Sequence, residues 1–149
     1  MTAKTFIDTN IYIYALTRSR NPNDENKREI AISLFEKLIN THTIVTSTQV
    51  LNEFHSNLIK KFKIEDKEAF NIVEHNILPI SIIAPIGFKT YSLAYQLRSE
   101  YNLSFWDSLI VASSLENNCT TLYSEDMQHN QSIKNQLLII NPFEQDVKD

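Results

Sequence analysis

Short apolar runs alternate with helix-like segments along almost the whole 149-residue sequence. Each run has the length of a buried strand, and the segments between the runs carry apolar residues at helical spacing. Strands that are separated by helices favour a parallel sheet with helices on both of its faces. The five strands expected from this pattern are residues 5–8, 43–46, 78–83, 120–123 and 137–140.

The length and composition fit one α/β domain over residues 1–149. Apolar residues make up 42% of the chain and charged residues 21%, as in an ordinary globular protein. We therefore expect three layers, α/β/α, with a central parallel sheet of four to five strands flanked by helices. The polar tail at residues 141–149 is expected to fray.

Composition also excludes several kinds of function. Gly87 is the only glycine, whereas phosphate-binding loops for ATP, GTP or NAD need several. A single cysteine, Cys119, cannot form an internal disulfide, which favours a reducing compartment. No apolar run is long enough to cross a membrane. We expect a cytoplasmic protein without a nucleotide cofactor.

Four acidic residues occupy positions where parallel α/β proteins place their binding sites. Asp8 ends the first strand, and Asp126 follows the fourth. Glu53 lies early in the helix after the second strand, and Asp107 lies in the first turn of the helix LSFWDSLIVASSL. Because ligands bind beyond the carboxyl ends of such strands, we expect these carboxylates to converge.

Each of these acids also has a purely structural explanation. Asp107 follows Ser104 in the pattern S-x-x-D, which is a helix capping box. Asp8 could begin a turn, Glu53 could be solvated, and Asp126, like Glu125, could be a loop acid or a helix N-cap. However, Asp8 and Asp107 follow the apolar residues of FID and FW, where an unpaired charge is costly.

A divalent cation resolves the cost of placing several carboxylates together. Mutual repulsion raises their pKa values, and an oxygen-preferring ion such as Mg²⁺ or Mn²⁺ removes that repulsion. Such an ion can also offset the net charge of −4 when a polyanion binds. The only basic clusters are Lys60, Lys61 and Lys63, with Arg18 and Arg20. The four histidines show no metal-ligand spacing: His42, His55, His75 and His129.

The pieces FIDTNIYIYAL, STQVLNEF, LSFWDSLIVASSL and TLYSEDMQHNQ, in this order, resemble the PIN-domain ribonucleases. The resemblance is strongest to the VapC-type toxins of bacterial toxin–antitoxin pairs, and it runs from Phe6 to about Pro142. It implies a PIN-like fold. The sequence departs from the family at Asn118 and Asn130, where relatives often have glycine. Asparagine tolerates the left-handed conformation, so we expect the same turns.

Carried over by position, the family's acidic site falls on Asp8, Glu53, Asp107 and Asp126, as catalytic residues and as ligands of Mg²⁺ or Mn²⁺. Asn10 and Ser124 would support them. Glu125 competes with Asp126 for the last position, and the form of S-E-D favours Asp126.

The resemblance implies hydrolysis of RNA phosphodiester bonds by metal-activated water, with tRNA, rRNA or mRNA as substrate. It also implies a cognate antitoxin and a homodimer. Two alternatives stay open: an RNA-processing PIN nuclease without an antitoxin, and a non-catalytic PIN scaffold that binds RNA or protein. Aspartyl-phosphate enzymes are disfavoured, because they need a second acid where this chain has Asn10.

Overall fold

A computed structural model describes residues 2–144, and at its centre is a six-stranded sheet. The strand order is β3-β2-β1-β4-β6-β5, and all neighbours are parallel except β5 and β6. The expected α/β arrangement is confirmed, with an additional two-residue edge strand. The strands are β1 (Ala3–Ile7), β2 (His42–Ser47), β3 (Ser81–Ala84), β4 (Thr121–Tyr123), β5 (Ser132–Ile133) and β6 (Leu137–Ile140).

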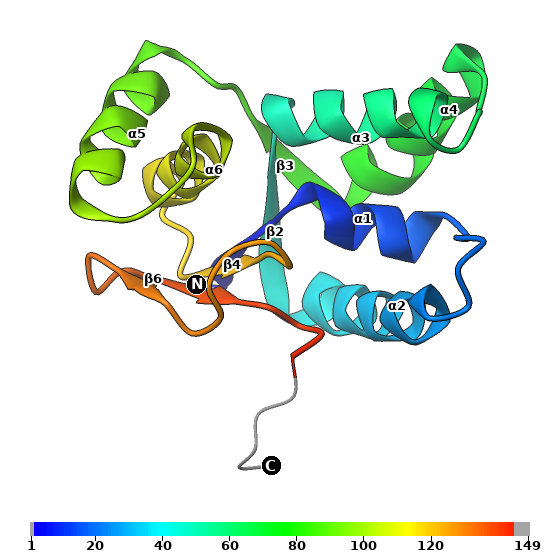
Figure 1. The fold of residues 1–149 in the computed structure, drawn as a ribbon, viewed down its shortest axis with the longest axis horizontal. Coiled ribbons are helices and arrows are strands. Elements are labelled where there is room, and N and C mark those ends of the chain that lie inside the picture. Colours follow the sequence, from blue (N-terminus) through cyan, green and yellow to red (C-terminus); the bar gives the residue numbers. More distant parts are fainter. Residues whose placement is uncertain (1, 145–149) are drawn as a thin grey trace.

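Helices cover both faces of this sheet (Figure 1). Helices α1 to α4 lie on one side, and α5 and α6 lie on the other. Their bounds are α1 (Thr9–Leu16), α2 (Asp24–Thr41), α3 (Thr48–Lys60), α4 (Asp66–Ile72), α5 (Phe88–Glu100) and α6 (Phe105–Glu116). A π-helical turn, η1 (Val73–Ile77), continues α4, and a 3-10 turn, η2 (Leu78–Ile80), leads into β3.

The direction in which the sheet is wound reverses at β1. This strand pairs with β2 on one side and with β4 on the other, so the first three strands extend one way and the last three the other. The reversal leaves a crevice beyond the carboxyl ends of β1 and β4, where α/β proteins bind ligands. Asp8 immediately follows β1, and Ser124 immediately follows β4.

Helix α6 is the most buried helix, as its composition predicts. Residues 108–114 are all buried, because the helix lies between the sheet and α5 (Figure 1). Helix α3 instead buries one stripe, which contains Val50, Phe54 and Leu58. The other residues of α3 are half-buried or exposed, and Glu53 is one of the exposed residues.

One detail of the expected fold is wrong. The strand predicted at residues 78–83 begins only at Ser81, because Pro79 lies in the preceding turn and has no N–H for a strand ladder.

The tail predicted to fray covers residues 141–149, and its first residues make contacts with the rest of the chain. The Asn141 side chain donates to the Glu125 carbonyl, and the Phe143 ring packs on Tyr14 with ring centres 5.0 Å apart. Residues 145–149 lie outside the described part of the chain.

The turns expected at two asparagines are confirmed. Asn118 has a φ of 59° and Asn130 a φ of 64°, both in the left-handed region. Asparagine reaches this region more easily than other non-glycine residues. The chain therefore makes these turns although it contains only one glycine.

Candidate functional site

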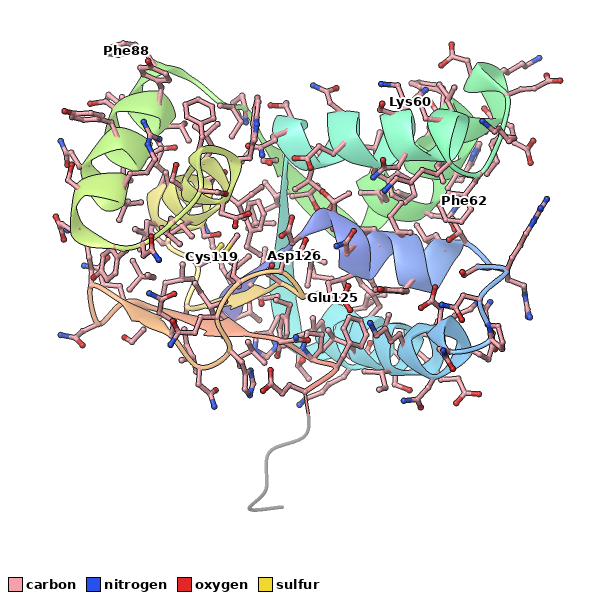
Figure 2. All side chains as sticks on the ribbon, viewed as in Figure 1. Lys60, Phe62, Phe88, Cys119, Glu125 and Asp126 are labelled. Atoms are coloured by element: carbon pink, nitrogen blue, oxygen red, sulfur yellow. The ribbon has the colours of Figure 1, made fainter. Side chains whose placement is uncertain are left out.

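The four acids that the sequence singles out line a single small pocket at the carboxyl edge of the sheet. Asp8, Glu53, Asp107 and Asp126 share this pocket, which has a volume of about 80 Å³, with Asn10. Figure 2 shows Asp126 near the middle of the molecule, on the loop after β4. We call this cavity the acidic pocket. Its remaining lining residues are Thr9, Gln49, Asn57, Trp106 and Ile110.

Asp8 is the most buried of the four acids, with 9% of the residue exposed. Its carboxylate caps α1: Oδ1 accepts a hydrogen bond of 2.7 Å from the Thr9 N–H. The other oxygen, Oδ2, accepts a hydrogen bond of 2.9 Å from the Ser124 hydroxyl. Because both oxygens are bonded, the orientation of this carboxylate is set by its neighbours.

Asp107 is placed by the start of α6. The Ser104 hydroxyl accepts a hydrogen bond of 3.1 Å from the Asp107 backbone N–H, so Ser104 is the N-cap. The capping box predicted for this pair is only half present. Within residues 2–144 the Asp107 carboxylate has no hydrogen-bond partner, and it lines the acidic pocket instead.

Glu53 and Asp126 are both exposed, and each is held by an amide side chain. Gln49 Nε2 donates to Glu53 Oε1 at 2.9 Å, across one turn of α3. Asn10 Nδ2 donates to Asp126 Oδ2 at 2.9 Å and joins α1 to the loop after β4. Amide donors can orient these two carboxylates without neutralising their charge.

Glu125 does not line the acidic pocket. Its carboxylate forms an ion pair with Lys27 of α2 and accepts a hydrogen bond of 2.8 Å from the Tyr14 hydroxyl. Asp126, the next residue, therefore has its side chain on the pocket side of the loop. Figure 2 shows the two side chains next to each other at the end of β4.

Burial and neighbouring charges shift the proton affinity of this site. Desolvation raises the pKa of Asp8 to about 6; the hydrogen bonds from Thr9 and Ser124 oppose the rise, and Glu53 and Asp107 add to it. Desolvation also raises the pKa of Asp126, and Glu125 and Asp107 contribute to that shift. The acidic residues therefore interact electrostatically although they come from four separate segments.

The pocket suits a hard divalent cation by the chemistry of its side chains. Its acids offer only oxygen ligands, which Mg²⁺ and Mn²⁺ prefer, and no histidine or cysteine lines it. Among residues 2–144, however, no three acidic, histidine or cysteine side chains already converge closely enough to hold an ion. The carboxylates would have to turn toward one another to share one cation.

The pocket is also lined by Gln49, Asn57 and Trp106, which the sequence, considered mainly for its acidic residues, did not predict. Gln49 lies four residues before Glu53 and Asn57 four residues after it. Gln49, Glu53 and Asn57 therefore project from the same side of α3. That spacing was the available signal. Trp106 directly precedes Asp107 in the sequence, but its direction depends on how α6 is packed.

The basic residues expected to contact a polyanion lie in part near this site. Lys61 and Phe62 line a neighbouring pocket of about 200 Å³, and this pocket shares Asn10 and Asn57 with the acidic pocket. Figure 2 shows Lys60 at the end of α3 and Phe62 on the chain beyond the helix. Arg18 and Arg20 are exposed on the loop after α1.

Among the residues described, no helix is long and apolar enough to span a membrane.

The family model of the PIN domain matches residues 5–131. No curated protein matches the chain.

Several solved structures are similar to this chain in fold. FitAcB from Neisseria gonorrhoeae is 17% identical, with a TM-score of 0.66, over 93% of this chain and 97% of that one. A toxin–antitoxin complex from Klebsiella pneumoniae is 20% identical, with a TM-score of 0.66, over 94% and 98%. VapC20 from Mycobacterium tuberculosis, a toxin that cleaves the sarcin–ricin loop, is 16% identical, with a TM-score of 0.57, over 79% and 86%.

Proposed function

The chain belongs to the PIN-domain family, and on that basis we propose that it is a metal-dependent endoribonuclease. PIN domains are generally metal-dependent nucleases, and the structural neighbours include toxin–antitoxin proteins. The observation that carries the proposal is the acidic pocket, in which Asp8, Glu53, Asp107 and Asp126 line one cavity. We further propose that the protein is the toxin of a type II toxin–antitoxin pair.

The charge of the site argues for a cation as part of the activity. RNA phosphates are repelled by a cluster of carboxylates, so the pocket without a cation opposes the substrate. A bound Mg²⁺ or Mn²⁺ would lower the pKa of a water molecule and offset the charge that develops on the phosphate. Such an ion would be held by Asp8 and Asp107, with Glu53 and Asp126 completing its surroundings.

The other residues of the pocket orient these acids. Ser124 and Thr9 hold both oxygens of Asp8, and Asn10 holds Asp126. Helix α6, in which residues 108–114 are all buried, is a rigid support for the Asp107 carboxylate. Rigid supports of this kind keep catalytic groups correctly positioned relative to the phosphodiester bond.

The partners follow from the same proposal. The substrate is RNA (tRNA, rRNA or mRNA), and a small antitoxin would block the acidic pocket in the resting cell. An arginine from the antitoxin would suit the pocket, because guanidinium groups pair well with clustered carboxylates. We also propose a homodimer in the cytoplasm.

Growth and cleavage assays test the activity. Wild-type protein expressed in a bacterium should arrest growth, and Asp8→Asn or Asp107→Asn should abolish the arrest. Glu116→Gln is the matched control, because Glu116 is an exposed acid at the other end of α6. Arrest by the two pocket variants as strong as that of wild type would refute cleavage as the cause.

Cleavage of labelled RNA by purified protein tests the chemistry itself. EDTA should stop it, and added Mg²⁺ or Mn²⁺ should restore it. Cleavage that continues in EDTA would rule out the metal mechanism. Metal-dependent cleavage without growth arrest would instead identify an RNA-processing nuclease, and RNA binding without cleavage would identify a non-catalytic scaffold.

A further inference from the structure

A large aromatic side chain stands in solvent at the rim of the acidic pocket. Trp106 is the only tryptophan of the chain, it is 64% exposed, and it lines the acidic pocket beside Asp107. Tryptophan is highly buried on average, since its exposure leaves a large apolar surface in water. An exposed tryptophan at a binding site is therefore a candidate contact for a ligand with an apolar face.

Trp106 also forms part of a second cavity next to the first. This apolar pocket has a volume of about 540 Å³ and shares Gln49, Glu53 and Trp106 with the acidic pocket. Its apolar walls include Ile86 and Leu109. A ligand in this pocket would be next to both Glu53 and Trp106.

Further exposed aromatic rings extend outward from Trp106. Phe105, 42% exposed, packs edge-on against it with ring centres 5.0 Å apart. The Arg98 guanidinium lies 4.8 Å from the Phe105 ring centre and 5.9 Å from that of Tyr95, which is 64% exposed. We call Trp106, Phe105, Arg98 and Tyr95 the aromatic strip.

The start of this strip is tied to the acidic pocket. Gln49 Nε2 donates to Glu53 Oε1 at 2.9 Å and to the Trp106 carbonyl at 3.4 Å. The same amide thus holds a pocket carboxylate and the backbone that carries the indole. At the other end, Arg98 donates to the Ser108 hydroxyl at 2.8 Å, which fixes its guanidinium between the two rings.

We propose that Trp106 is a base-stacking platform, on which an unpaired RNA base lies next to the phosphodiester bond to be cut. This inference rests on the proposed ribonuclease function and adds the residue that positions the substrate. Every base has a flat face that stacks on aromatic rings, and only unpaired bases can present that face. Arg98 supplies a positive charge for the strand along the strip.

A protein partner is the competing occupant of an exposed aromatic surface. RNA is favoured because the strip begins at the acidic pocket, where a phosphate of the same strand would be cut. Stacking faces and a positive group farther along the strip are what a single strand requires. A second copy of the chain is kept as an outcome of the test below.

Because Trp106 is the only tryptophan, the intrinsic tryptophan fluorescence reports on this side chain alone. In Mg²⁺, a short unpaired RNA oligonucleotide should quench the intrinsic tryptophan fluorescence of the Asp8→Asn protein as it binds, because this variant keeps Trp106 and is expected not to cleave. The same oligonucleotide with abasic positions, or annealed to its complement, should quench it weakly. Equal quenching by the abasic strand would overturn the proposal.

Binding of fluorescein-labelled RNA in Mg²⁺ to variants that all carry Asp8→Asn gives the second readout, with Asp8→Asn alone in place of wild type. Trp106→Ala should weaken binding of the unpaired strand by about 5-fold to 150-fold, the range for loss of one stacked base. Trp106→Phe, which keeps an aromatic face, should recover most of the affinity. Phe88→Ala is the matched control: Phe88 is 80% exposed but lies at the outer end of α5, away from Asp126 in Figure 2. Its affinity should equal that of Asp8→Asn alone.

Unchanged RNA affinity in Trp106→Ala would refute the platform. If sedimentation of the same variant also showed a shift from dimer to monomer, the strip would be assigned to contact between copies. Failure of the ribonuclease proposal is separate. Absence of cleavage by wild type in Mg²⁺ refutes the activity, whereas the binding assays with the Asp8→Asn protein test the platform alone.

Discussion

The Ser124 hydroxyl donates a hydrogen bond of 2.9 Å to Asp8 Oδ2, across the point where the winding of the sheet reverses. The two residues are 116 positions apart, and each directly follows its strand, β4 and β1. The bond joins two halves of the chain at the acidic pocket. It also provides a hydrogen-bond donor for a carboxylate that is almost completely shielded from solvent.

Loss of this hydroxyl should destabilise the protein. Ser124→Ala leaves a buried carboxylate oxygen without its donor, which is expected to lower the free energy of unfolding by about 1–3 kcal/mol. Urea denaturation at pH 7 in EDTA measures the change. In an Asp8→Asn background the same Ser124→Ala substitution should cost less, because the charge is gone. Equal costs in both backgrounds would show that the bond does not act through the carboxylate.

Removal of the charge on Asp8 should make the metal-free protein more stable at pH 7. Its pKa is raised from 3.8 to about 6, so burial opposes the ionised form. Asp8→Asn should therefore raise the free energy of unfolding, by at most about 3 kcal/mol for a shift of this size, while RNA cleavage is lost. Added Mg²⁺ should stabilise wild type more than the variant. A variant less stable than wild type in EDTA contradicts the prediction.

The gain from Asp8→Asn should depend on pH. Between pH 4 and 6 the folded protein binds a proton at Asp8 that the unfolded chain has lost, because the folded pKa is the higher one. The contribution of Asp8 to stability is therefore greatest at pH 4 and decreases as the pH rises through 6. Urea titrations in EDTA should show the variant diverging from wild type over this window and running parallel above it. A constant difference from pH 4 to 7 would exclude the raised pKa as the source.

Substitutions of Asp107 and Ser104 should distinguish a role in RNA cleavage from a role in helix capping. The N-cap bond uses the backbone N–H of Asp107, which Asp107→Asn retains, so stability should change by less than about 0.5 kcal/mol. RNA cleavage should nevertheless be lost. Ser104→Ala should do the reverse, with a stability cost of about 0.5–2 kcal/mol and cleavage retained at a temperature where the protein is folded. Thermal unfolding and cleavage rates, measured side by side, test both.

Glu125 and Asp126 are adjacent in the sequence and should differ in their effects. Asp126→Asn changes a carboxylate of the acidic pocket and should lower cleavage at least 10-fold. Glu125→Gln weakens the contacts with Lys27 and Tyr14, both outside the acidic pocket, and should cost at most about 1 kcal/mol of stability. Its cleavage rate should stay within a few-fold of wild type. A larger loss in Glu125→Gln than in Asp126→Asn would reverse the assignment.

The layers of the fold were predictable because their signals are local. The alternation of short apolar runs with helical periodicity implies a parallel α/β sheet, and the all-apolar residues after Asp107 imply a buried helix. The left-handed turns at Asn118 and Asn130 follow from the conformational tolerance of asparagine. Pro79 lies inside the run at residues 78–83, and its missing N–H was a sufficient reason to start that strand later.

The sequence by itself determined which carboxylates end strands or begin helices, and hence that Asp8, Glu53, Asp107 and Asp126 would meet at one edge of the sheet. Only the tertiary structure decided the directions of the side chains. Glu125 faces Lys27, Asp126 faces Asn10, and Trp106 lies at the rim of the acidic pocket. The physical reason is that strand and helix formation depend on neighbours within a few residues, whereas side-chain direction depends on partners a hundred positions away.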